Sequence, residues 1–186
     1  MVRIVVEGKS DKNFLKNFIN FLGFDCSDDN FIVMGNKSSL LDSENNGYSR
    51  LKQEIKFGLV DRLLFVVDAD NIQNDNIYGG VTNTKNALNS LKYSLDIDKL
   101  ADFYINSVPG KEEGYLEGLL LSTVDDKLKD CYENFLKCSG LKSKDNYKTV
   151  MEELHRLTKP ERPFDFTHPN FTELKTKLQN LFKEEI

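Results

Sequence analysis

Residues 2–6 read VRIVV and lead directly into Glu7. Residues 63–67 read LLFVV and lead into Asp68 and Asp70. Short apolar runs rich in β-branched residues predict strands that are buried on both faces, as in a parallel sheet. Ligands bind at the carboxyl edge of such sheets in open α/β proteins. We therefore expect acids from two separate strands to meet at one edge of the sheet.

The remaining chain alternates predicted strands with predicted helices. Further strands are expected at 31–34 and 103–105, and helices at about 10–22, 48–57, 84–95, 115–121, 125–138, 145–157 and 170–183. This order predicts an α/β fold, with a parallel sheet of about four strands flanked by helices and a helical C-terminal third. We expect a single domain, in which residues 1–122 form the core and residues 123–186 form a helical extension packed on it.

Two segments between these elements are polar. Residues 36–47 are rich in Ser, Asn and Gly and are expected to form a mobile loop. Residues 71–83 directly follow the Asp pair and are expected to overhang it. Both segments would shape access to the acidic edge.

Composition limits the classes of function. The chain is 39% hydrophobic and 30% charged, which is typical of a soluble globular protein. No apolar run approaches the roughly 20 residues of a membrane helix, and residues 1–6 lack the basic start of a signal peptide. The formal charge of −5 argues against broad, non-specific binding of nucleic acid but allows a few phosphate contacts through a metal ion.

The cysteines and histidines do not indicate a zinc site or a disulfide scaffold. Cys26, Cys131 and Cys138 form no Cys-x-x-Cys motif, so we expect a reducing, cytoplasmic compartment. Cys131 and Cys138 lie seven residues apart on a predicted helix and are expected to be core thiols. His155 and His168 have no ligand-like companions, which favours structural or surface roles.

Three carboxylates that converge in a small space need a cation, and hard oxygen ligands suit Mg²⁺ or Mn²⁺. Asp68 and Asp70 are expected to hold this metal ion. Glu7 has two possible roles: it completes a second metal position, or it acts as a general acid or base with a pKa raised by its acidic neighbours. Two neighbouring ions would clamp a phosphate and activate water.

Four other charged residues are candidates for the same edge. Asp11 either stabilises a helix N-terminus or reaches the metal. Glu117, in the first turn of a short helix, is a metal-ligand candidate whose alternative role is again a favourable contact with the helix dipole. Lys9 and Lys111 either bind a phosphate and stabilise leaving-group charge, which would make Lys111 catalytic, or remain solvated.

Two alternative motifs do not fit. The Gly8-Lys9-Ser10 sequence is not a P-loop, because that motif needs another Gly where this chain has Arg3. A phosphatase with an aspartyl nucleophile in the Asp-x-Asp motif would leave Glu7 unexplained.

The motifs resemble those of a known family. VVEGKSD at 5–11 followed by VVDAD at 66–70 is similar to the Toprim domain of topoisomerases, bacterial primases and OLD-family nucleases. VPG at 108–110, GYLEGLL at 114–120 and FDFTHP at 164–169 resemble a small stand-alone group of Toprim-like proteins that is DUF3226-like. The resemblance implies Mg²⁺-dependent phosphodiester chemistry on DNA or RNA. It also implies that Glu7 is an acid/base or metal ligand and that Asp68 and Asp70 are metal ligands.

We therefore expect a nuclease-like phosphodiesterase that acts on nucleic acid. The alternative is a non-catalytic metal- or nucleotide-binding module that acts through a partner protein. No topoisomerase strand-passage domain, primase accessory module or OLD-type ATPase accompanies the motifs in these 186 residues. The substrate surface must therefore come from the chain itself or from a partner.

Overall fold

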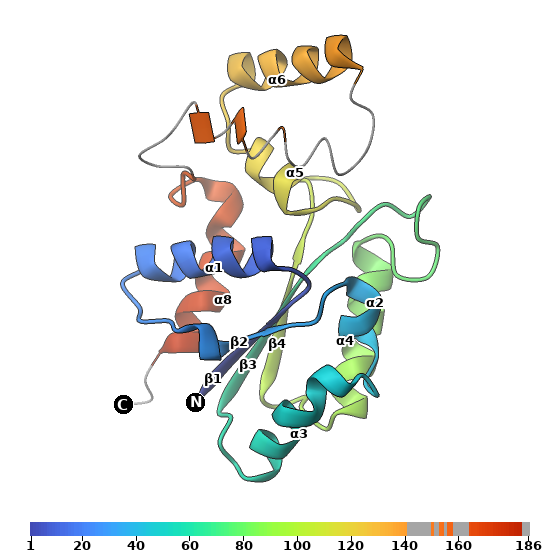
Figure 1. The fold of residues 1–186 in the computed structure, drawn as a ribbon, viewed down its shortest axis with the longest axis vertical. Helices are drawn as coiled ribbons and strands as arrows, with labels where there is room; N and C mark the ends of the chain where they lie inside the picture. The colour runs from blue at the N-terminus through green and yellow to red at the C-terminus, as the bar shows by residue number, and fades with distance from the viewer. Residues whose placement is uncertain (141–149, 151–152, 155, 158–163, 184–186) are drawn as a thin grey trace.

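The computed structural model describes residues 1–140, 150, 153–154, 156–157 and 164–183. Within them, four parallel strands form one sheet in the order β2-β1-β3-β4 (Figure 1). The strands are β1 (Val2–Val6), β2 (Phe31–Val33), β3 (Arg62–Asp68) and β4 (Ala101–Asn106). The predicted α/β fold with a four-stranded parallel sheet is thus confirmed.

The register of the two central strands positions the acidic residues. Val6, the last residue of β1, pairs with Val66 of β3, so both strands end at nearly the same level. Asp68, the last residue of β3, pairs with Asn106, the last residue of β4. Residues that follow β1 and β3 therefore share the carboxyl edge with the end of β4.

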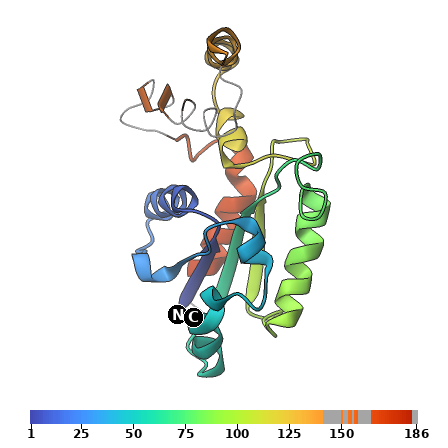
Figure 2. The same cartoon turned by 45° about the vertical axis from the view of Figure 1, so that its right-hand side comes forward.

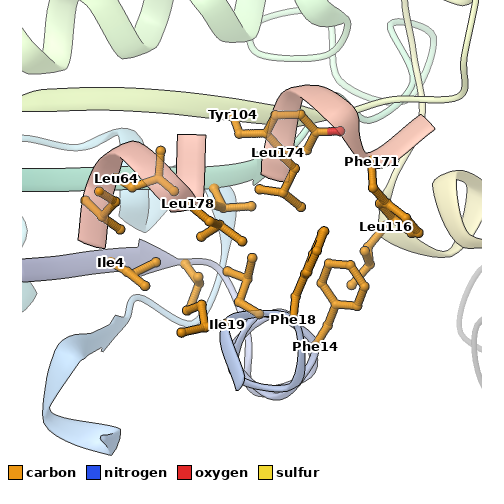
Figure 3. Packing of buried hydrophobic residues seen from close by; sticks show 14 of the residues in the cluster. Ile4, Phe14, Phe18, Ile19, Leu64, Tyr104, Leu116, Phe171, Leu174 and Leu178 are labelled. Carbon is orange, nitrogen blue, oxygen red and sulfur yellow. The ribbon is translucent and has the colours of Figure 1, made fainter. Parts of the chain in front are cut away.

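One face of the sheet is covered by α1 (Lys9–Phe21) and α8 (Thr172–Phe182), as Figure 2 shows. Their apolar side chains meet over the strands, with Phe14 and Phe18 facing Leu174 and Leu178 (Figure 3). Phe166 stacks on Phe18 with a centroid distance of 4.4 Å. This aromatic layer ties the chain segment before α8 to the first helix.

The opposite face is covered by α2 (Lys37–Leu41), α3 (Ser49–Lys56) and α4 (Val81–Ser94). The prediction of a mobile loop over 36–47 is wrong, because this segment contains α2 and a short 3-10 turn, η2 (Asn46–Tyr48). Asn36 caps α2 by accepting a hydrogen bond from Ser39 N, and Leu40 is buried in the core. The polar residues of this segment outweighed Leu40 in the prediction, although Leu40 fixes the segment to the core.

Beyond the carboxyl end of the sheet lie α5 (Leu116–Leu121) and α6 (Asp126–Ser139), as both Figure 1 and Figure 2 show. Helix α6 buries Tyr132 and Leu136 in a small cluster with Leu121 and Val124. The prediction that Cys131 and Cys138 are core thiols is wrong, because both are exposed. The helix buries a different stripe of its surface.

The remaining short elements are the 3-10 turns η1 (Asp28–Asn30) and η3 (Pro169–Phe171). His168 caps η3, where its Nδ1 accepts a hydrogen bond from Asn170 N, and His155 lies outside the described residues. Most of the helix expected at 145–157 also lies outside them. In the part of the chain that is described, no helix combines the length and apolar character needed to cross a membrane.

Candidate functional site

Glu7 and Asp68 meet at the carboxyl edge of the sheet. Glu7 Oε1 accepts a hydrogen bond of 2.8 Å from the main-chain N–H of Asp68. This contact forms because β1 and β3 are paired, so the residue after β1 reaches the end of β3. Glu7 therefore faces the Asp68–Asp70 segment.

The environment of Glu7 changes its acidity. The pKa of Glu7 is raised to about 7, chiefly by burial, and the negative charges of Asp70 and Asp11 contribute smaller increases. The hydrogen bond from Asp68 N and the positive charge of Lys37 act in the opposite direction. A carboxyl group with a pKa near neutrality can give or take a proton at physiological pH.

The Asp68 side chain is buried and held by two donors. Its Oδ1 accepts hydrogen bonds from Asn106 Nδ2 and from the main-chain N–H of Leu116, both 3.0 Å long. A carboxylate only accepts, so this contact also fixes which end of the Asn106 amide faces it. Asn106 Oδ1 is then a buried acceptor with no hydrogen-bond partner among the described residues.

Sequence reasoning missed Asn106. The signal that could have found it is its position one residue after the predicted strand 103–105, which matches the position of Asp68 after its own strand.

Asp70 lies in a backbone conformation that is uncommon for residues other than glycine. Its φ is 58°, and Asp is among the residues that tolerate this left-handed region. Its N–H donates to Gly114 O over 2.7 Å, and Gly114 N–H donates back to Asp70 O over 3.3 Å. The loop before α5 thus holds the Asp-x-Asp turn in place.

Lys37, from the first turn of α2, is the second residue that sequence reasoning missed. Only 5% of it is exposed. Its Nζ donates to Asp68 O over 2.7 Å and to Ala69 O over 2.9 Å, and it lies 3.5 Å from Asp70 Oδ2. A lysine in a Ser- and Asn-rich segment is usually solvated, so the sequence around Lys37 gives no sign of burial. The packing of α2 against this edge of the sheet becomes visible only in the fold.

Asp11 and Glu117 lie on the helices that begin near the site. Asp11 Oδ2 accepts a hydrogen bond of 2.8 Å from Gly8 N, which is a capping contact at the start of α1. Its charge also reaches Glu7, whose pKa it raises. Glu117 is buried in the first turn of α5 and lines a cavity of about 250 Å³ that Ser10 also lines.

Lys111 lies in a second cavity, of about 320 Å³, which is also lined by Asp70, Tyr115 and Lys129. Its side chain is exposed, as is that of Lys9. The structure therefore places Lys111 beside the Asp-x-Asp turn, at the rim of the same cavity.

The donor set consists of hard oxygens, which suits Mg²⁺ or Mn²⁺. However, across the described ranges no group of three or more His, Cys, Asp or Glu side chains is arranged to hold a metal ion. Mg²⁺ commonly binds through one or two carboxylates and completes its shell with water and substrate phosphates. The residues present fit that mode of binding and not a closed cage made of protein ligands.

Fold and edge residues define the class: an open α/β protein whose acidic groups gather at the carboxyl ends of parallel strands. The chain belongs to the DUF3226 family, because the model of this family, described as a protein of unknown function, matches residues 1–183. The resemblance to the DUF3226-like group is thereby confirmed. No curated protein and no solved structure that was compared with the chain matches it.

Proposed function

We propose that this protein is a Toprim-like, Mg²⁺-dependent phosphodiesterase that cleaves nucleic acid, DNA or RNA. One observation carries the proposal: Glu7, the residue after β1, accepts a hydrogen bond from the main-chain N–H of Asp68 at the end of β3. Asp70 lies two residues further along the same turn. The acids of two strands that meet at one carboxyl edge follow the order of the Toprim motifs that the sequence resembles. The raised pKa of Glu7 adds the property expected of a proton-transfer group.

Each residue has a role in this account. Asp68 and Asp70 would hold Mg²⁺, with Asp68 kept in orientation by Asn106 and Leu116 N. Bound Mg²⁺ supplies charge neutralisation at a phosphate and lowers the pKa of water. Metal ligands held by further hydrogen bonds bind with less loss of side-chain freedom.

The reaction is a hydrolysis. A water oxygen forms a bond to phosphorus while the bond from phosphorus to one sugar oxygen breaks. Glu7 takes one proton of the attacking water, whose other proton stays on the new phosphate oxygen, and the departing sugar oxygen takes a proton from a solvent water. Lys111 lies at the rim of the Asp70 cavity, where it would stabilise charge on a phosphate.

One observation favours the alternative of a non-catalytic metal- or nucleotide-binding module acting through a partner protein. Lys37 already places a positive charge among the acids, so their repulsion is reduced without any bound ion. In that case the edge would bind its ligand without turnover.

Cleavage assays separate the two functions. The full chain is incubated with end-labelled single- and double-stranded DNA and RNA in Mg²⁺, Mn²⁺ or a chelator. The phosphodiesterase predicts metal-dependent cutting that Glu7→Gln and Asp68→Asn each reduce by at least about 100-fold, the scale of losing a proton-transfer group.

Asp98→Asn serves as the matched control, because Asp98 is an exposed acid before β4, at the other end of the sheet. It should cut like the wild type. Cutting that survives in Glu7→Gln and Asp68→Asn would indicate a contaminating nuclease and overturn the proposal. Metal binding without cutting of any substrate supports the module.

A further inference from the structure

The Lys37 ammonium group has the surroundings of a bound cation. An ammonium group has three N–H donors. Three oxygens lie within 3.5 Å of Nζ: the main-chain oxygens of Asp68 and Ala69 and the Asp70 carboxylate. Main-chain carbonyls and a carboxylate are also the kinds of ligand that hard metal ions select.

A lysine is seldom buried this completely unless opposite charge compensates it. Asp70 supplies this opposite charge, because its Oδ2 lies 3.5 Å from Lys37 Nζ and the two side chains are 18% and 6% exposed. The ammonium is also close enough to Glu7 to act on its charge. One positive charge therefore lies among the acids of two strands.

We propose that Lys37 is a built-in cation that takes the place of one of the two ions of a two-metal site, so that this edge binds a single divalent ion. The inference rests on the proposed function, because it concerns the metal of the same site. Lys37 is a positioning residue in this account. It fixes the turn of residues 68–70 and repels a second ion, and it does not touch the reacting atoms.

Electrostatics predict the direction in which replacing Lys37 changes the affinity for the metal ion. Removing a unit positive charge a few ångströms from a divalent ion strengthens the binding of that ion. It also leaves the oxygens around Nζ available to a second ion. A residue with only a structural role would weaken metal binding when it is replaced, or leave it unchanged.

The number of bound ions is the decisive measurement. Mn²⁺ is titrated into the full chain, and the free ion is followed by its electron paramagnetic resonance signal. The wild type should bind one Mn²⁺. Lys37→Met, which keeps the length of the side chain but not its charge, should bind two, with the first at least tenfold tighter.

Two variants control this result. Lys37→Arg keeps the positive charge and should still bind one ion. Lys56→Met removes an exposed lysine at the end of α3 and should also bind one. Together they separate the charge at position 37 from side-chain size and from the total charge of the protein.

The outcomes distinguish the inference from the proposed function. Two ions in the wild type, or one in both the wild type and Lys37→Met, overturns the inference and leaves the function standing. No ion in the wild type and one in Lys37→Met overturns both, because the inference requires one ion bound beside Lys37 in the wild type. No ion in either protein overturns both.

Folding of Lys37→Met is checked in parallel by its melting midpoint. A variant that folds only when Mn²⁺ is added supports the inference, because the ion then replaces the missing charge. A variant that remains unfolded in saturating Mn²⁺ overturns it.

Discussion

Glu7 Oε1 accepts a hydrogen bond from the main-chain N–H of Asp68 over 2.8 Å, across the paired strands β1 and β3. The two residues lie far apart in the sequence, so only the parallel pairing of their strands brings them together. This contact couples the acidity of Glu7 to the position of the Asp-x-Asp turn, and the predictions on metal binding and pH follow from it.

The raised pKa of Glu7 predicts a pH-dependent stability. The folded protein holds the proton of Glu7 up to about pH 7, whereas the unfolded chain releases it near the ordinary value of 4.5. The contribution of Glu7 is therefore fully present below pH 4.5 and is lost as pH rises through 7, by about 3 kcal/mol at about 1.4 kcal/mol per unit.

Urea unfolding of the metal-free wild type and of Glu7→Gln from pH 4.5 to 8 checks this contribution. As pH rises, the unfolding free energy of the wild type should fall relative to that of Glu7→Gln, because Gln cannot ionise. A difference that stays constant across this range would show that Glu7 titrates normally.

The neighbourhood of Asp68 predicts that Asn106→Asp is rescued by metal. A new carboxylate beside the buried Asp68 replaces a donor with a like charge, so the unfolding free energy without metal should fall by about 1–3 kcal/mol. Mg²⁺ should recover most of the loss. Asn86→Asp, at an exposed position on α4, should change little in either condition, and equal losses in both variants would count against the account.

The turn that holds Asp70 predicts a strong effect of Gly114→Ala. Gly114 has a φ of +142°, and a Cβ atom there would lie 2.5 Å from Val108 N. The unfolding free energy should fall by more than about 2 kcal/mol, since backbone strain and a steric clash add. Gly110 also has a positive φ, but no atom lies within 4 Å of a Cβ added there. The unfolding free energy of Gly110→Ala should therefore fall by only about 1 kcal/mol. Denaturant midpoints of the two variants test the contrast.

The aromatic layer between α1 and α8 predicts that Phe18→Ala lowers the unfolding free energy by about 3–5 kcal/mol. Phe18 is fully buried and stacks on Phe166. Phe57→Ala is the control, because Phe57 is 72% exposed and should change the free energy by less than about 0.5 kcal/mol. Similar midpoints for the two variants in urea would show that this face is not packed as described.

The strands and most helices followed from local patterns. Residues 2–6 and 63–67 are short apolar runs between polar segments, so their length and β-branching identified them as buried strands. The segment 36–47 was wrongly predicted to be a mobile loop, because its Ser, Asn and Gly content outweighed Leu40 and Leu41. These two leucines pack α2 against the core.

The candidate site was only partly predictable for a similar reason. Acids directly after a buried run are visible in the sequence, which is how Glu7, Asp68 and Asp70 were found. Lys37 and Asn106 acquire their meaning from contacts with Asp68 and its neighbours, and these contacts exist only after the sheet has formed. Periodicity failed for Cys131, because the buried stripe of α6 depends on what packs against it.

The most direct test of the central claim is an anomalous-difference map from a crystal of the full chain grown with Mn²⁺. The account predicts one peak at the carboxyl edge of the sheet, in contact with carboxylate oxygens of Asp68 and Asp70 and on the side of Glu7. A map with no peak at this edge, or with Mn²⁺ bound only elsewhere, would contradict it.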